Sequence, residues 1–143
     1  MYFCFAKIGG AHQIELSLRP QSVLNVRMKK LALFPLPGHN EYTLANGLRI
    51  IHQPAYSNVA YCGFAVDAGT RDEAENEQGM AHFVEHLIFK GTEKRKAWHI
   101  LNRMENVGGD LNAYTNKEET VVYAAFLKEH LERALELLGD IVF

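Results

Sequence analysis

The order of strand-like and helix-like segments after residue 38 is the feature that most constrains the fold. Short runs rich in Val, Ile, Tyr, Phe and Thr are typical of strands, and they occur at residues 41–44, 48–51, 59–68, 111–115 and 120–127. Apolar residues recur every three or four positions at about 79–89, at 96–107, and from 131 onward, which predicts three helices. Hairpin-like strands mixed with helices predict an α+β fold, a mostly antiparallel sheet with helices packed on one face.

Local signals indicate where the chain turns and which helix faces are buried. Asn46-Gly47 separates the first two strand runs, and this pair readily adopts the positive φ values of a tight hairpin. The helix positions expected to face the core are Met80, Phe83, Val84, Leu87 and Ile88, then Ile100, Leu101, Met104 and Val107, and finally Leu131, Ala134, Leu135, Leu138 and Ile141. Because no stop signal follows the last helix, we expect the chain to be part of a longer domain.

The clearest break in the chain is Pro35-Leu36-Pro37-Gly38, where two prolines favour extended backbone and the glycine allows a turn. We therefore expect residues 1–38 to be an N-terminal extension and linker, with the folded domain beginning at residue 39. Apolar and polar residues alternate over 14–18, which fits a strand, but a loosely ordered leader fits as well. The first residues lack the basic and apolar regions of a secretory signal, so a cytoplasmic location is expected.

Composition excludes several classes of function. The 143 residues are 48% hydrophobic, enough for one globular core, and the net charge of −2 gives no general attraction to nucleic acid or an anionic membrane. The longest uncharged apolar runs are far shorter than the roughly 20 residues of a membrane helix. There is no C-x-x-C pair, and Cys62 is expected to be a small buried hydrophobe. The acidic stretch 72–77 is expected to be a solvated loop rather than a calcium site.

One predicted helix carries the run His82-Phe83-Val84-Glu85-His86. Residues four apart share a helix face, so both histidines can direct ring nitrogens to one point, with Glu85 at the flank. Two imidazoles and a third protein ligand leave a position for water in a catalytic zinc site, and a nearby carboxylate can accept that water's proton. Chance would give this H-x-x-E-H pattern about 0.03 times in such a chain.

The alternative is a partly buried helix whose histidines only hydrogen-bond to their neighbours. Unpaired polar groups on an otherwise apolar helix are costly, so the pattern favours a zinc site over that alternative.

Further motifs lie on both sides of this helix, between residues 44 and 127. They are LANGLR at 44–49, DAGTRDE at 67–73, GMAHFVEHL at 79–87, FKGT at 89–92, ENVGGDLNAYT at 105–115 and the strand run at 121–127. In order and spacing they resemble the family of pitrilysin, insulin-degrading enzyme and mitochondrial processing peptidase, the inverted-motif zinc metallopeptidases. The resemblance covers residues 41–143.

The resemblance implies a processing-peptidase-like metallohydrolase fold and a zinc-dependent endopeptidase, a hydrolase that cuts unfolded peptides or small proteins. By position, His82 and His86 would be two ligands of one Zn²⁺ ion per catalytic domain, and Glu85 would be the general base. The family's third ligand is a glutamate on a later helix, expected beyond residue 143. Residues 39–143 would then be the first part of the catalytic domain, and the chain by itself is expected to be inactive and to hold little zinc.

The resemblance also implies how a substrate binds. Asn112, Ala113 and Tyr114 would lie on an exposed edge strand that pairs with the backbone of a peptide substrate, although the residues alone would suit an ordinary paired strand equally well. A second family domain, in the same chain or in a homo- or heterodimer partner, would close over the peptide. Neither nucleic acid nor a membrane is expected as a partner.

Two other functions are possible for such a sequence. Some members of the family are non-catalytic partner or scaffold subunits, but these usually lose a residue of the His82, Glu85 and His86 set, which is intact in this chain. A lyase of the S-ribosylhomocysteine type also uses H-x-x-E-H, but it needs a downstream cysteine ligand, and no cysteine follows Cys62.

Overall fold

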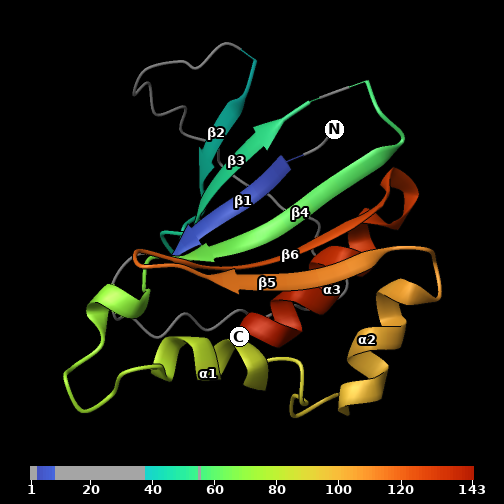
Figure 1. Ribbon diagram of the computed structural model, residues 1–143. Coiled ribbons are helices and arrows are strands. Elements are labelled where there is room, and N and C mark those ends of the chain that lie inside the picture. The colour runs from blue at the N-terminus through green and yellow to red at the C-terminus, as the bar shows by residue number, and fades with distance from the viewer. Residues whose placement is uncertain (1–2, 9–37, 55) are drawn as a thin grey trace.

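A six-stranded sheet is the centre of the fold (Figure 1). The structure is a computed structural model that describes residues 3–8, 38–54 and 56–143. The strands are β1 (Phe3–Ile8), β2 (Asn40–Thr43), β3 (Arg49–Gln53), β4 (Val59–Val66), β5 (Asp110–Thr115) and β6 (Thr120–Leu127). Their order in the sheet is β2-β3-β1-β4-β6-β5, and every neighbouring pair is antiparallel except β1 with β4. The α+β class and the mostly antiparallel sheet are confirmed.

Strand β1 comes from the stretch expected to be an extension, and nothing in the sequence pattern predicted a strand there. It lies between β3 and β4, with Phe3 opposite Gln53 on one side and Tyr61 on the other. The alternating residues 14–18 lie outside the described residues, and the boundary at residue 38 stays a prediction.

The hairpin predicted around Asn46-Gly47 joins β2 to β3. Gly47 has a φ of +87°, and the Asn46 side chain accepts a hydrogen bond from the Leu48 N–H at 3.1 Å. The glycine therefore supplies the left-handed conformation that the turn requires.

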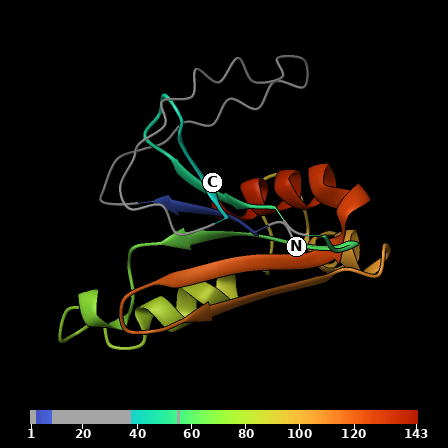
Figure 2. The ribbon, with the colours of Figure 1, turned by 90° about the horizontal axis from the view of Figure 1, so that it is seen from above.

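Three helices accompany the sheet: α1 (Met80–Leu87), α2 (Ala97–Glu105) and α3 (Leu131–Val142), with short 3-10 turns η1 (Thr70–Asp72) and η2 (Lys128–His130). Figure 2 shows α3 lying along one face of β4 and β6. The core forms on that face, and its buried residues are Leu48, Ala60, Cys62, Phe64, Ile100, Met104, Val122, Ala124, Phe126, Ala134, Leu137, Leu138 and Ile141. Among the described residues, no helix is long and apolar enough to cross a lipid bilayer.

The predicted helix faces are correct for α2 and α3 except at three leucines. Leu101 and Leu135 were expected to be buried but are exposed, whereas Leu137, which was not predicted, is fully buried. Leu101 and Leu135 each follow a buried residue, Ile100 and Ala134, and one step along a helix turns the side chain by about 100° away from the packed face.

Candidate active site

The two histidines of the H-x-x-E-H motif come together on α1. Their Nε2 atoms lie 3.1 Å apart, with the rings nearly perpendicular and their centroids 4.7 Å apart. Two nitrogen ligands of a tetrahedral zinc ion, each 2.0–2.1 Å from the metal, lie about 3.3 Å from one another. The spacing of His82 and His86 therefore fits two ligands of a single ion, and one helical turn is enough to produce it.

The structure does not identify a third ligand. Among the described residues, no group of three His, Cys, Asp or Glu side chains is close enough to hold a metal ion. The carboxylates near the end of the chain do not complete the pair, and Glu136 on α3 is bound instead to Arg95 and Arg103.

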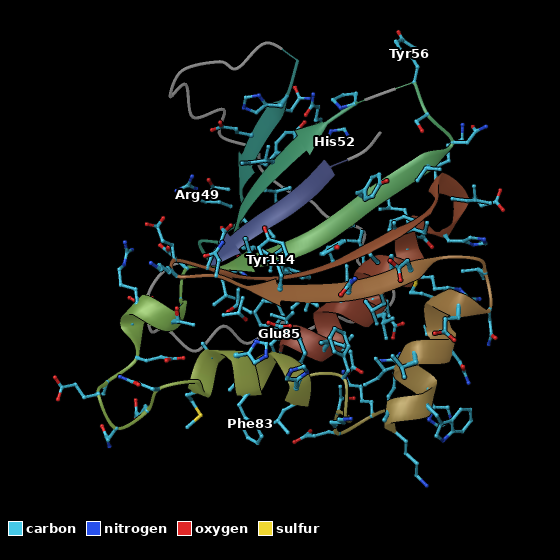
Figure 3. All side chains as sticks on the ribbon, viewed as in Figure 1. Arg49, His52, Tyr56, Phe83, Glu85 and Tyr114 are labelled. Atoms are coloured by element: carbon cyan, nitrogen blue, oxygen red, sulfur yellow. The ribbon has the colours of Figure 1, made fainter. Side chains whose placement is uncertain are left out.

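Glu85 is the third residue of the motif, and its side chain faces the sheet. In Figure 3 it lies on the side of α1 that faces β5, whereas Phe83 points away from the sheet. The Glu85 side chain is 14% exposed, and its Oε2 lies 3.7 Å from Nδ1 of His82. A carboxylate is thus present beside the histidine pair, on the side of α1 that faces β5.

The apolar face of α1 is not buried, contrary to the sequence prediction. Met80, Phe83, Val84 and Leu87 are between 45% and 57% exposed, and α1 has no buried residue. Only the residues after its last turn, Ile88 and Phe89, pack against the core. Helical periodicity correctly predicted the helix, but the described part of the chain supplies no surface to cover this face.

Strand β5 lies beside α1 and ends the sheet (Figure 1). Leu111 and Ala113 pack against the core, while Asn112 and Tyr114 are exposed. The Ala113 N–H donates a hydrogen bond to Oδ1 of Asn112 at 2.9 Å rather than to β6. Because main-chain groups alternate in direction along an antiparallel strand, the groups of Leu111 and Thr115 also face the free edge. This edge can accept another strand.

Tyr114 stands on the exposed face of β5. Its ring lies 6.4 Å from that of Tyr123 on β6, and its hydroxyl donates a long hydrogen bond to Glu119 at 3.5 Å. Burial, followed by the charge of Glu119 and the hydrogen bond to it, raises the pKa of the Tyr114 hydroxyl. The hydroxyl is therefore a proton donor at neutral pH.

The carboxylate of Glu73 binds the first turn of α1. The sequence prediction assigned this residue to a solvated loop. The two oxygens of Glu73 accept hydrogen bonds from the N–H groups of Gly79 and Ala81, both at 2.8 Å. Gly79, the N-cap, has a φ of +89°, which is unfavourable for other residues. An acidic residue shortly before a helix was a usable signal, because free N–H groups at a helix start attract carboxylates.

The segment after α1 is bound to α3. Thr92 donates a hydrogen bond to Oδ2 of Asp140 at 2.8 Å, and Arg95 forms ion pairs with Asp140 and Glu136. Burial of Asp140 opposes its ionisation, but the hydrogen bonds from Arg95 and Thr92 and the charge of Arg95 outweigh burial and lower the pKa of Asp140. Polar contacts thus hold the start of α1 and, together with the packing of Ile88 and Phe89, the segment that follows it.

Known proteins resemble most of this chain. A family model described as Insulinase (Peptidase family M16) matches residues 49–143. The mitochondrial-processing peptidase subunit beta of Rattus norvegicus is 40% identical over 134 residues, which is 94% of this chain and 25% of that protein. The subunit beta of Bos taurus is 37% identical over 135 residues, which is 94% of this chain and 28% of that protein.

A solved structure of a protease from Helicobacter pylori has a TM-score of 0.71 and 32% sequence identity, covering 74% of this chain and 26% of that one. The chain thus spans about a quarter of the length of these relatives.

The relatives correct the expected location. Those from rat, mouse, Arabidopsis thaliana and Dictyostelium discoideum are all named as subunits of a mitochondrial peptidase, so the predicted cytoplasmic location is wrong. The prediction tested only for a secretory signal with an apolar centre. Mitochondrial transit peptides are amphipathic and rich in Arg, so that test does not detect them.

The family assignment rests on the extent of the match. The family model covers about two thirds of the chain and includes the histidine pair, Glu85 and all of β5. The matching relatives are named as subunits, which places them in assemblies with other chains. This chain therefore belongs to the insulinase family of peptidases, family M16.

Proposed function

We propose that this chain carries the metal-binding helix and the substrate-binding edge strand of a zinc-dependent endopeptidase that cuts unfolded peptides or small proteins. The observation that carries the proposal is the 3.1 Å approach of the His82 and His86 Nε2 atoms, with the Glu85 carboxylate 3.7 Å from His82 and on the side of α1 that faces β5. Membership in a peptidase family supports peptide-bond hydrolysis as the reaction.

His82 and His86 would hold the ion through Nε2, and a third ligand would come from outside residues 38–143. When bound, zinc acts as a Lewis acid that lowers the pKa of water and polarises a carbonyl group. A histidine that binds through Nε2 carries its proton on Nδ1. In His82 that atom lies 3.7 Å from Oε2 of Glu85, and the negative charge of the carboxylate favours the tautomer with the proton on Nδ1.

Glu85 would be the general base. Its carboxylate would accept a proton from the attacking water and deliver it to the nitrogen of the leaving amine. Among the described residues, Glu85 contacts His82 through Oε2 and has no hydrogen bond, so Oε1 is available for proton transfer.

A peptide would bind by adding a strand to β5. The Ala113 N–H would donate to a peptide carbonyl after the peptide displaces the Asn112 side chain, and Asn112 and Tyr114 would flank the bound backbone. Recognition through the main chain depends little on sequence but requires an extended segment. The substrates would therefore be unfolded.

The decisive test is Glu85→Gln in the full-length protein that contains this chain. The amide cannot accept the proton, so hydrolysis of an unfolded reporter peptide should fall by at least about 100-fold, while bound zinc stays at the wild-type level. Glu105→Gln, at an exposed position on α2, is the matched control and should change neither.

Retained turnover in Glu85→Gln would assign the base to another residue, and loss of zinc would make Glu85 a ligand. A zinc-loaded wild-type protein that cleaves no unfolded peptide would instead support the alternative, a non-catalytic partner or scaffold subunit.

A further inference from the structure

Glu73 lies outside the proposed catalytic set, yet it connects the two parts of the site. We propose that Glu73 is a positioning residue that fixes α1, with its histidines and Glu85, at a set place relative to the edge strand β5. This inference rests on the proposed function, because it concerns how a peptide bound at β5 meets the groups on α1.

The first part of the connection joins β5 to the η1 turn. The Thr70 N–H donates to the carbonyl oxygen of Asn116 and the Arg71 N–H to that of Lys117, both at 3.0 Å, and the Arg71 guanidinium pairs with Glu118 at 2.8 Å. Residues 116–118 form the turn that follows β5. The segment before Glu73 is therefore attached to the end of the edge strand.

The second part joins Glu73 to α1. Asp72, the residue just before Glu73, is bound within the η1 turn, since its Oδ2 accepts a hydrogen bond from the Gly69 N–H at 2.9 Å. Glu73 then binds the Gly79 and Ala81 N–H groups with separate oxygens. A negative charge at this end of the helix is also favoured by the helix dipole.

Apolar packing does not hold the first turn of α1. The helix has no buried residue, and its contacts with the core come after its last turn, at Ile88 and Phe89. Hydrogen bonds at the helix start therefore have more influence on its position than they would in a helix embedded in the core. Glu73 provides two such bonds within the described residues.

Loss of these two hydrogen bonds should slow the chemical step without weakening peptide binding. A peptide would still pair with β5, and the two histidines would still face each other across one helical turn. The distance from the scissile carbonyl to Glu85 would change, and misplacement of about 1 Å can cost 100-fold in rate. The effect should therefore fall on kcat.

The test compares Glu73→Ala and Glu73→Gln with Glu75→Ala in the full-length protein that contains this chain. Glu75 is an exposed neighbour in the same acidic stretch and serves as the control. In Glu73→Ala we expect kcat on an unfolded reporter peptide to fall roughly 10- to 100-fold, with KM and zinc content within about twofold of wild type. Glu73→Gln keeps one acceptor oxygen and should recover part of kcat, and Glu75→Ala should match wild type.

A second readout does not depend on activity. Amide hydrogen exchange over residues 79–87, measured without zinc, should become faster in Glu73→Ala and remain unchanged in Glu75→Ala.

A lower melting temperature with unchanged kcat, or a loss of zinc with unchanged kcat per loaded molecule, would overturn the positioning role. If the zinc-loaded wild type cleaves nothing, the proposed function fails. In that case unchanged exchange over 79–87 would also overturn the role of Glu73 in fixing α1, and faster exchange would support it.

Discussion

Helices α1 and α3 have similar apolar periodicity but opposite surroundings. Leu137 and Leu138 of α3 are completely buried where the helix lies against β4 and β6, whereas the apolar residues of α1 are largely exposed. Apolar burial holds α3, while α1 is held at its start by the two hydrogen bonds to Glu73 and packs against the core only after its last turn. The comparison teaches that periodicity predicts a helix without predicting what covers it, and that the proposed catalytic residues lie on the less buried helix.

The largest effect on stability should come from a substitution in the buried apolar face of α3. Leu138→Ala leaves a cavity at a fully buried position between α3 and the sheet, and it should lower the free energy of unfolding by about 2–5 kcal/mol. Urea unfolding followed by circular dichroism measures this change. A loss below about 1 kcal/mol would show that α3 is not the main apolar support of the sheet.

The next largest effect should come from Asp140 on α3, whose ion pair with Arg95 joins α3 to the segment that follows α1. Asp140→Asn removes the charge that pairs with Arg95 and should cost about 1–3 kcal/mol near pH 7. Because the folded state lowers the pKa of Asp140, its contribution is present above the unfolded value of about 3.9 and is lost as pH falls through the lower folded value.

The difference in unfolding free energy between wild type and Asp140→Asn should therefore be largest at neutral pH and shrink below about pH 4. A difference that grows on acidification would contradict the assignment of this charge.

A smaller effect should distinguish the main-chain groups of β5 that face the free edge from those that face β6. Ala113→Pro removes an N–H that faces the free edge, so the sheet should remain folded and zinc content should not change. Peptide affinity of the full-length protein, measured by titration, should fall roughly three- to tenfold for the lost hydrogen bond.

Tyr114→Pro is the matched comparison, because alternation directs its N–H toward β6, and this variant should unfold more easily. Normal peptide binding by Ala113→Pro would show that the substrate binds elsewhere.

The smallest effect should come from the exposed face of α1. Phe83→Ser removes an apolar side chain that is more than half exposed, so the free energy of unfolding of the 143-residue chain should change by less than about 0.5 kcal/mol. The same urea experiment as for Leu138→Ala measures it. A loss comparable to that of Leu138→Ala would mean that this face is covered in solution.

Local sequence patterns were enough to predict much of the fold and the approach of the two histidines on α1. Asn46-Gly47 predicts its hairpin because the turn chemistry is contained in two residues, and His82 and His86 meet because one helical turn brings them together. Strand β5 could be assigned to an edge only through the family resemblance, since the residues of an edge strand and a paired strand look alike. Arg95 and Asp140 form an ion pair although they are 45 residues apart in the sequence, and no rule of residue spacing predicts that pair.

Gly69 limits how this sequence can vary. Its φ of −144° suits any residue, so the limit is one of space: a Cβ at this position would lie 2.5 Å from the carbonyl oxygen of Asn116 and 2.6 Å from the Glu118 nitrogen. Both are backbone atoms that cannot rotate away. Even alanine would force the η1 turn away from the β5–β6 turn. Because Glu73 follows η1 and is hydrogen-bonded to the first turn of α1, the helix would be displaced as well. A relative could thus keep every residue of H-x-x-E-H and still lose its activity through one methyl group on the neighbouring loop.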